Sequence, residues 1–308
     1  QSRGFWTRIS SPMTLEPIPS MTNSSCYGLK DAICCTDKTL QSNEHKHITV
    51  TMITFISCAK TMAREVSARI PRVNEPQYLH HAQVLTERLA AFSVEELMDI
   101  LKVSPAIATE NQLRYKSIVA GEAEMMPAIF AYTGMVFKHI DPYSLSTQEL
   151  EYAHGHLRIT SFLYGLLRPL DAISPYRLEG GVTLDRDTGK SMFNYWQPVL
   201  TDSFIDEINA SGGTLVNLAS GEMKSLFDWK KIESAVNVVH PEFLVQGKDG
   251  KTKTVTVYAK MCRGEMTRYI ITNRISDPED LKSFEWNGFG YDRERSDETK
   301  YVFIKQTK

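Results

Sequence analysis

The sequence lacks any uninterrupted apolar run of about 18 residues, and it lacks a charged start followed by an apolar core. A transmembrane helix needs the first pattern, and a secretory signal needs the second. We therefore expect no membrane span, no membrane partner and a cytoplasmic location. A strong charge of one sign is also missing, because the formal net charge is only −2. This excludes a protein that coats nucleic acid with its whole surface, so any basic site must be local.

Cysteine and metal-ligand patterns are sparse as well. The five cysteines are an odd number and form no CxxC pair, which argues against a disulfide or zinc framework and favours reduced thiols. The neighbours His80 and His81, and the nearby His154 and His156, lack the i,i+4 spacing that puts two ligands on one helix face. We expect no bound metal and no cofactor.

The common catalytic signatures are absent too. The chain has no GxxxxGK[ST] phosphate loop, no GxGxxG, no GxSxG nucleophile elbow and no HExxH zinc motif. These absences remove the most frequent nucleotide-binding, hydrolase and zinc-enzyme families. Whether the chain is an enzyme stays open at this point.

Two parts of the chain differ in character. Residues 1–51 are rich in Ser, Thr, Pro and Asn without a sustained hydrophobic period, so we interpret them as a disordered or non-native leader. An organellar targeting segment is a less favoured alternative, because it would carry more Arg and a clear amphipathic period. Met52 opens a β-branched and aromatic run and is a candidate for the native start. We expect one domain over residues 52–308, since no repeat or linker interrupts it.

Hydrophobic periodicity predicts both helices and strands after residue 51. Ser93 with Glu96 forms a capping box, and Ser104 with Pro105 marks a helix start. The predicted helices are three in series over 76–118, then 146–157, 194–209, one near Ser220, and 261–275. The predicted strands are 52–57, 128–133, 214–218, a hairpin of 235–245 with 252–258, and a pair within 284–304, while 159–163 is ambiguous. This order predicts a mixed α/β fold, in the sense of α+β, as a single compact domain.

Four segments place polar or basic residues beside predicted strand ends, where turns hold side chains rigidly. Taken singly, each has a structural explanation such as a surface ion pair or a cap. Taken together they predict one shared cleft, and the stretch from Lys251 to Arg274 has six Lys or Arg against one Glu, a net charge of +5. Such a patch suits phosphates, to which Arg offers a bidentate fork and Lys a point charge. The candidates are Lys60; Arg168, Asp171, Tyr176, Arg177 and Glu179; Asn217, Ser220 and Glu222; and Lys260, Arg263 and Arg268.

The same segments resemble a known family. AK after the first strand, LYGLLRPLD with PYRLE, FNYW, NLAS, and the spaced YAK, RG, R and I occur in the order found in the YaaA peroxide-stress family. The likeness covers about residues 52–305 and is to members of the kind found in the Bacteroidetes. It implies one compact domain of unusual α/β architecture, a positively charged cleft, binding of double-stranded and distorted DNA, and protection from hydrogen peroxide by limiting free iron.

The resemblance also implies a helix-hairpin-helix-like element, which would fall on 93–118 with the hairpin at 102–107. Two departures from the family are visible. Val103-Ser104-Pro105 stands where a DNA-binding hairpin usually has Gly-x-Gly, whose glycines let backbone amides approach phosphate. Cys58 stands where the family has Pro, so a family-wide redox role for this thiol is disfavoured.

Three hypotheses about function follow. The leading one is a monomeric, cytoplasmic peroxide-stress protein that binds DNA phosphates without base readout, with Tyr176, Asn217 and Ser220 as further polar groups of the cleft. An alternative is an uncharacterised enzyme acting on a phosphorylated or nucleotide-like small molecule, with Asp171, Glu179 and Glu222 as candidate acid and base. Direct iron binding is the third, and the sequence offers it no closed ligand set. The residues expected to contact phosphate are Lys60, Arg168, Arg177, Lys260, Arg263 and Arg268.

Overall fold

The computed structural model describes residues 51–184 and 189–306, and within these ranges eight strands form one main sheet. The sheet has the order β4-β3-β1-β6-β7-β10-β9, with β8 paired to β7. Strands β3, β1, β6, β7 and β10 run parallel, and β4, β8 and β9 pair antiparallel at its borders. The strands are β1 Met52–Ile56, β3 Leu157–Ser161, β4 Gly165–Leu167, β6 Thr214–Asn217, β7 Asn237–Gln246, β8 Thr252–Lys253, β9 Phe289–Tyr291 and β10 Lys300–Gln306. A small separate sheet pairs β2 Met126–Pro127 with β5 Ala172–Ile173.

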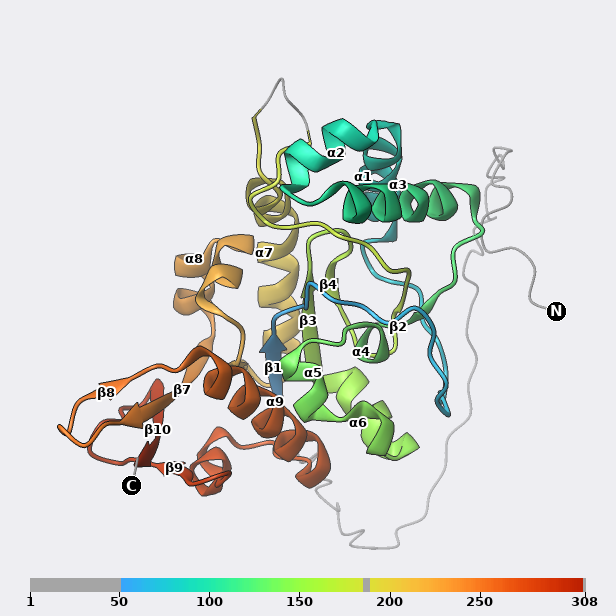
Figure 1. The fold of residues 1–308 in the computed structure, drawn as a ribbon. Helices are drawn as coiled ribbons and strands as arrows, with labels where there is room; N and C mark the ends of the chain where they lie inside the picture. Colours follow the sequence, from blue (N-terminus) through green and yellow to red (C-terminus); the bar gives the residue numbers. More distant parts are fainter. Residues whose placement is uncertain (1–50, 185–188, 307–308) are drawn as a thin grey trace, which may run out of the picture. The chain divides into compact units, whose positions relative to one another are not determined.

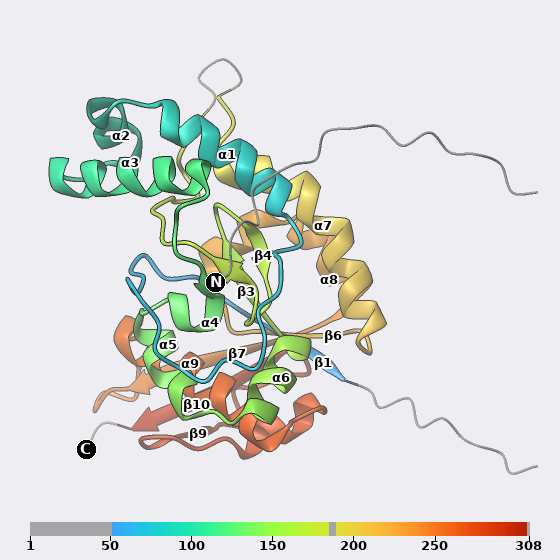
Figure 2. The same ribbon diagram turned by 90° about the vertical axis from the view of Figure 1, so that its right-hand side faces the viewer.

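Helices cover the sheet and connect its parallel strands (Figure 1). Helix α6 packs against β1 and β3, α7 packs against β4 and β6, and α9 packs against α5 and β7. Figures 1 and 2 agree that α7 and α8 lie side by side, apart from α5, α6 and α9. The α-helices are α1 Leu79–Ala91, α2 Val94–Leu101, α3 Pro105–Ala120, α4 Ala128–Ala131, α5 Met135–Ile140, α6 Thr147–His156, α7 Met192–Ala210, α8 Trp229–Ala235 and α9 Thr256–Asn273. Short 3₁₀ helices are η1 Pro142–Ser144, η2 Gly221–Leu226 and η3 Pro278–Ser283.

Strand β1 is an interior strand of the sheet, between β3 and β6. Every residue of its sequence MITFI is buried, as expected for a parallel strand covered on both faces. The Phe55 ring lies 5.5 Å from the rings of both Phe204 in α7 and Phe227 after η2. Aromatic packing of this kind ties the sheet to its covering helices. The mixed α/β fold in one compact domain is therefore confirmed over the part that the structure describes.

Several local predictions are confirmed by the capping geometry. Helices α1, α2 and α3 follow one another as expected, and Ser93 and Glu96 form a complete capping box. Lys102 ends α2 in the left-handed conformation, with φ of 53°, and a short turn leads into α3. Ser104 precedes α3 but makes no side-chain cap bond. The helix pair is thus present, while its identity as a DNA-binding hairpin stays a prediction.

The predicted strand at 128–133 is wrong, because this segment forms helix α4. All of its residues from Ala128 to Ala131 are buried, and so short an apolar run carries no period that separates strand from helix. The backbone amide of Ala128 donates to the carbonyl of Asp171 at 2.9 Å, and that of Ile129 donates to Pro169 at 3.0 Å. Tertiary contacts with this loop therefore decide the conformation.

The predicted hairpin strand at 252–258 is only partly correct. Strand β8 covers only Thr252–Lys253, and helix α9 already begins at Thr256, before the predicted start at 261. The β-branched residues here favour strand by propensity, but packing of α9 against α5 and β7 overrides that preference. Lys260 therefore lies on the same helix as Arg263, not in the turn that leads to it.

The predicted leader at 1–51 lies outside the described residues except for Thr51. Among the helices of residues 51–184 and 189–306, none is long and apolar enough to cross a membrane.

Candidate functional site

A pocket of about 340 Å³ opens next to the carboxyl ends of β1, β3 and β6. Strand β1 lies between β3 and β6, and the chain passes from β1 to β3 and then back across β1 to β6. Ligands of open α/β sheets bind outside the carboxyl ends of the strands at such a reversal of strand order. The pocket is lined by residues 57–61, 134–137, 162, 176–179, 220, 222–223, 260 and 263.

The structure brings most of the predicted site residues together in this pocket. They come from the loop after β1, the loop after β5, the η2 turn after β6, and helix α9. Segments far apart in the sequence thus meet at one edge of the sheet, as the shared-cleft hypothesis requires. The predicted residues that line the pocket are Lys60, Tyr176, Arg177, Glu179, Ser220, Glu222, Lys260 and Arg263.

Glu179 pairs with two of the four pocket cations. Its Oε2 accepts a hydrogen bond from Lys60 Nζ at 2.6 Å, and its Oε1 accepts one from Arg177 NH2 at 2.6 Å. Partial burial acts to raise the pKa of Glu179, but the hydrogen bonds and charges of Lys60 and Arg177 outweigh it and leave the pKa below its usual value. Glu179 is therefore ionised at neutral pH and half of the positive charge at this side of the pocket is neutralised.

Lys260 and Arg263 form the other pair of cations, three residues apart on α9 and hence on one helix face. Within the described residues, neither side chain has a hydrogen bond or an ion pair, and Arg263 Nε is buried without a partner. Burial lowers the pKa of Arg263, yet an arginine stays protonated in proteins. A partly buried positive charge without a partner in the described chain therefore lies in the pocket wall.

The remaining acid in the pocket is Glu222, which is exposed on η2. With Glu179, it gives two carboxylates against the four cations Lys60, Arg177, Lys260 and Arg263, a formal net charge of +2. The pocket is positive although the whole chain carries a net charge of −2. A locally positive pocket of this kind attracts anions.

Hydroxyl groups line the pocket beside these charges. The Tyr176 hydroxyl bonds with Ser161 Oγ at 2.7 Å and with the Tyr132 hydroxyl at 2.9 Å, and burial raises the pKa of Tyr176 well above its usual value. Ser57 Oγ donates to Ser220 Oγ at 3.2 Å and accepts from the Ser220 backbone amide at 2.9 Å. Both sets of hydrogen bonds join different segments of the chain and so stabilise the shape of the pocket.

Two glycines allow the pocket walls to approach one another. A Cβ on Gly264 would lie 2.4 Å from the carbonyl oxygen of Val136 and 2.6 Å from His139 Cβ, so α9 meets α5 at this glycine. A Cβ on Gly134 would lie 2.7 Å from Ala59 Cβ, which brings the start of α5 against the loop after β1. Any larger residue at either position would push these walls apart.

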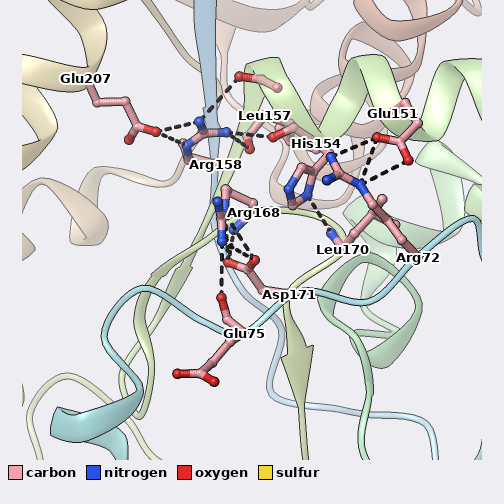
Figure 3. A network of polar contacts seen from close by, with 11 residues as sticks. Arg72, Glu75, Glu151, His154, Leu157, Arg158, Arg168, Leu170, Asp171 and Glu207 are labelled. Atoms are coloured by element: carbon pink, nitrogen blue, oxygen red, sulfur yellow. Dashed lines mark hydrogen bonds and ion pairs between the residues drawn. The ribbon is translucent and has the colours of Figure 1, made fainter.

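Arg168 and Asp171 do not line the pocket. Asp171 is fully buried and accepts hydrogen bonds from the backbone amide of Arg168 at 2.8 Å and from its Nε at 3.0 Å. Arg168 also donates to the Glu75 carbonyl at 3.1 Å. Figure 3 shows both residues in a network with His154, Arg158 and Glu207. Their observed contacts join segments of the fold.

Arg268 and Asn217 also lie outside the pocket lining. Arg268 NH1 donates to the carbonyl of Ile140, the last residue of α5, at 2.8 Å and to that of Asp141, its C-cap, at 3.2 Å. Asn217 is buried, and its Oδ1 accepts from the Ala219 amide at 3.0 Å, so it shapes the turn after β6. The polar group of Asn217 and the charge of Arg268 are thus occupied by the chain itself.

Several contributors to the pocket escaped the sequence reasoning. Ser57 sits at the end of β1 and contacts Ser220, and residues 134–137 and Phe162 form walls. A search of every residue just after a buried strand would have found Ser57. No signal of that kind marks 134–137, because this segment belongs to the start of a helix that reaches the pocket only through tertiary packing.

Metal-ligand geometry is absent over the same ranges. Among residues 51–184 and 189–306, no three His, Cys, Asp or Glu side chains come together in a group that could hold a metal ion. The expectation that the chain binds no metal stays a prediction.

Comparison with known proteins identifies the family. Residues 52–295 match the family model described as peroxide stress protein YaaA. The chain is 52% identical to a UPF0246 protein of Phocaeicola vulgatus over 252 residues, which is 82% of this chain and 98% of that protein. It is 51% identical to a UPF0246 protein of Bacteroides fragilis over 252 residues, with the same coverage, and 37% identical to one of Hahella chejuensis over 257 residues, 82% of this chain and 99% of that protein. The chain therefore belongs to the YaaA family of peroxide stress proteins.

Proposed function

We propose that this protein acts in the response to peroxide stress by binding a phosphate group in the pocket between β1, α5 and α9. Family membership supports the stress role. The observation that carries phosphate binding is Arg263, which lines the pocket and whose guanidinium has no hydrogen bond or ion pair within the described chain. A buried donor left unsatisfied is costly, and a phosphate oxygen would satisfy it.

The size of the pocket favours a small ligand or the end of a longer one. A volume of about 340 Å³ is at the lower end of the range for small-molecule sites. The flat side of a duplex cannot enter it. A phosphorylated or nucleotide-like small molecule therefore fits the geometry best, and Glu222 beside the pocket offers a general base if a reaction occurs there.

Thermal-shift measurements with inorganic phosphate, nucleotides and sugar phosphates test this proposal. A ligand at 100 times its dissociation constant stabilises the folded chain by about 2.7 kcal/mol. We expect Arg263→Gln to reduce the shift strongly and Lys230→Ala to leave it unchanged, since Lys230 is an exposed α8 lysine outside the pocket lining. No shift with any of these phosphates would refute the proposal.

DNA binding through the same cleft is the second candidate. Lys60, whose side chain is 66% exposed, gives the pocket a cation that a strand could reach from outside. The start of α3 is exposed from Ser104 to Ile107, and free amides at the start of a helix can receive a phosphate. Arg168 and Arg268 have partners in the chain and lie outside the pocket lining, so the phosphate contacts would come from the pocket cations, above all Lys260 and Arg263.

The salt dependence of DNA affinity tests the second candidate. The logarithm of the affinity should fall linearly with the logarithm of salt concentration, and Arg263→Ala should reduce that slope by about one unit per lost phosphate contact. Arg168→Ala should leave the slope unchanged. Absence of binding to duplex or junction DNA at low salt would exclude this candidate and leave the small-molecule proposal standing.

Limitation of free-iron damage is part of the proposed role. The effect would be exerted through the phosphate-binding pocket. Cells that carry Arg263→Gln in place of the normal chain should then accumulate more chelatable iron during peroxide exposure than cells that carry Lys230→Ala. Equal iron pools in the two strains, at equal protein levels, would separate iron control from the pocket.

A further inference from the structure

The four pocket cations differ in whether the chain already neutralises them. Glu179 accepts hydrogen bonds from Lys60 and Arg177, each at 2.6 Å, so these two cations share one internal carboxylate. Lys260 and Arg263 have no such partner within the described residues. The pocket therefore contains one pair of cations that shares the Glu179 carboxylate, although Arg177 Nε is itself buried without a partner, and one pair without a carboxylate, which we call the open pair.

The open pair has the better geometry for a doubly charged group. Its members are one turn apart on α9, and Arg263 is largely withdrawn from water while Lys260 is exposed. A partly buried guanidinium interacts more strongly with each added negative charge than an exposed one does, because the surrounding dielectric constant is lower. Hydrogen bonds between ionised partners are also about twice as strong as neutral ones.

We propose that the pocket selects the dianionic head of a phosphomonoester over the singly charged phosphate of a diester, and that Lys260 and Arg263 make this choice. This inference rests on the proposed phosphate-binding function and specifies its ligand. A phosphomonoester brings two negative charges to the two open cations, which leaves Glu179 in place on Lys60 and Arg177. An internal DNA phosphate is a diester and brings only one.

Two sources supply this chemistry, a small phosphorylated metabolite and the terminal phosphate of a broken DNA strand. Both present a terminal monoester that can enter a pocket of about 340 Å³. The proposal therefore concerns the phosphate head, and the experiment separates the sources.

Methyl phosphate and dimethyl phosphate are the matched probes, because they differ by one methyl group and one charge. Affinities are measured by titration calorimetry or by competition at constant ionic strength. We expect methyl phosphate to bind about tenfold or more tightly than dimethyl phosphate, since charge-assisted hydrogen bonds gain from the second charge. Lys260→Ala and Arg263→Gln should each abolish most of this preference, and Lys230→Ala should keep it.

Lowering the pH gives a second readout. The second pKa of a phosphomonoester is about 6, so methyl phosphate becomes singly charged between pH 7.5 and 5.5 and should bind more weakly. Sulfate remains doubly charged over this range and controls for any change in the charge of the pocket itself, where Glu179 and Glu222 are the described carboxylates among the lining residues, beside four cations. Among the residues that the structure describes, no histidine lines the pocket. Sulfate affinity should therefore change little.

The outcomes distinguish this inference from the proposed function. Equal affinity for methyl and dimethyl phosphate, unaffected by Lys260→Ala, would overturn the monoester preference and leave phosphate binding intact. Binding of neither probe, of sulfate or of any nucleotide would overturn both. A 5′-phosphorylated oligonucleotide that binds more tightly than its 5′-hydroxyl form and than methyl phosphate would identify the strand end as the source. If the 5′-phosphorylated oligonucleotide binds no more tightly than methyl phosphate, small metabolites are the source of the phosphate head.

Discussion

The fully buried carboxylate of Asp171 accepts hydrogen bonds from both the backbone and the side chain of Arg168, the residue that starts the same turn. The turn is tied to a distant segment, because the Asn74 amide donates to Leu170 at 2.9 Å and the Ala172 amide donates to Asn74 at 2.8 Å. The RPLD motif therefore joins two parts of the chain. Its charged residues have a structural explanation that is independent of the pocket.

Replacement of Asp171 should destabilise the fold without changing phosphate affinity. Asp171→Ala removes the acceptor of the Arg168 amide and Nε, and hydrogen bonds to a charged group of this kind contribute about 1.5–3 kcal/mol. The free energy of unfolding in urea measures this cost. Asp202→Ala is the control, because Asp202 is 72% exposed in its ion pair with Lys231 and exposed pairs contribute about 0–1 kcal/mol. Equal costs for the two variants would contradict the prediction.

The stability of the fold should decrease in mild acid because of His154. Burial, followed by the nearby charges of Arg168, Arg72 and Arg158, lowers the pKa of His154 to about 4. Its Nδ1 accepts from the Leu170 amide at 3.2 Å, which requires the neutral ring.

The sign of this effect follows from linkage. The unfolded chain binds the proton of His154 near pH 6.5, whereas the folded chain binds it only near pH 4. The stabilisation is therefore complete above pH 6.5 and is lost progressively as the pH falls toward 4, with a slope of at most about 1.4 kcal/mol per pH unit. His154→Asn keeps an acceptor for the Leu170 amide without this proton. Its unfolding free energy should depend less on pH, and an unchanged pH dependence would argue against the assignment.

Gly264 and Gly155 should respond oppositely to alanine. Gly264→Ala places a Cβ 2.4 Å from the Val136 carbonyl, and overpacking of this kind costs about 2 kcal/mol. Phosphate affinity should also fall, since Arg263 moves with α9. Gly155→Ala in α6 meets nothing within 4 Å and should stabilise the protein by about 0.5 kcal/mol, because alanine loses less entropy in a helix. Thermal denaturation of both variants provides the measurement, and stabilisation by Gly264→Ala would disprove the close helix contact.

The thiol of Cys58 should react slowly with peroxide and with alkylating reagents. Burial is the main cause that raises the pKa of Cys58 to about 11, and the charges of Glu222 and Glu179 act in the same direction. The thiolate is the reactive form, so only about one molecule in a thousand is reactive near pH 8. Peptide mapping by mass spectrometry after timed iodoacetamide treatment, with glutathione as reference, measures the rate. Modification of Cys58 faster than glutathione would show a lowered pKa.

Much of the fold could be predicted from local patterns. The buried strand β1, the helix series α1 to α3 and the capping box at Ser93 follow from hydrophobic period and capping chemistry, which act over a few residues. Helix α4 and the early start of α9 could not be predicted in this way. In both, contacts with distant segments override local propensity.

The sequence alone determined the family, the local basic charge and the segments that carry it, because motifs and composition are properties of the chain order. Only the tertiary structure decided which basic residues share a pocket. Arg263 and Arg268 lie five residues apart on one helix, about 140° of rotation, so one faces the pocket while the other caps α5. Glu179 and Asp171 are likewise close in sequence, yet Glu179 lines the pocket whereas Asp171 is buried in a turn and bonded to Arg168. The direction in which a side chain points depends on packing over the whole sheet, and packing joins residues that are far apart in the sequence.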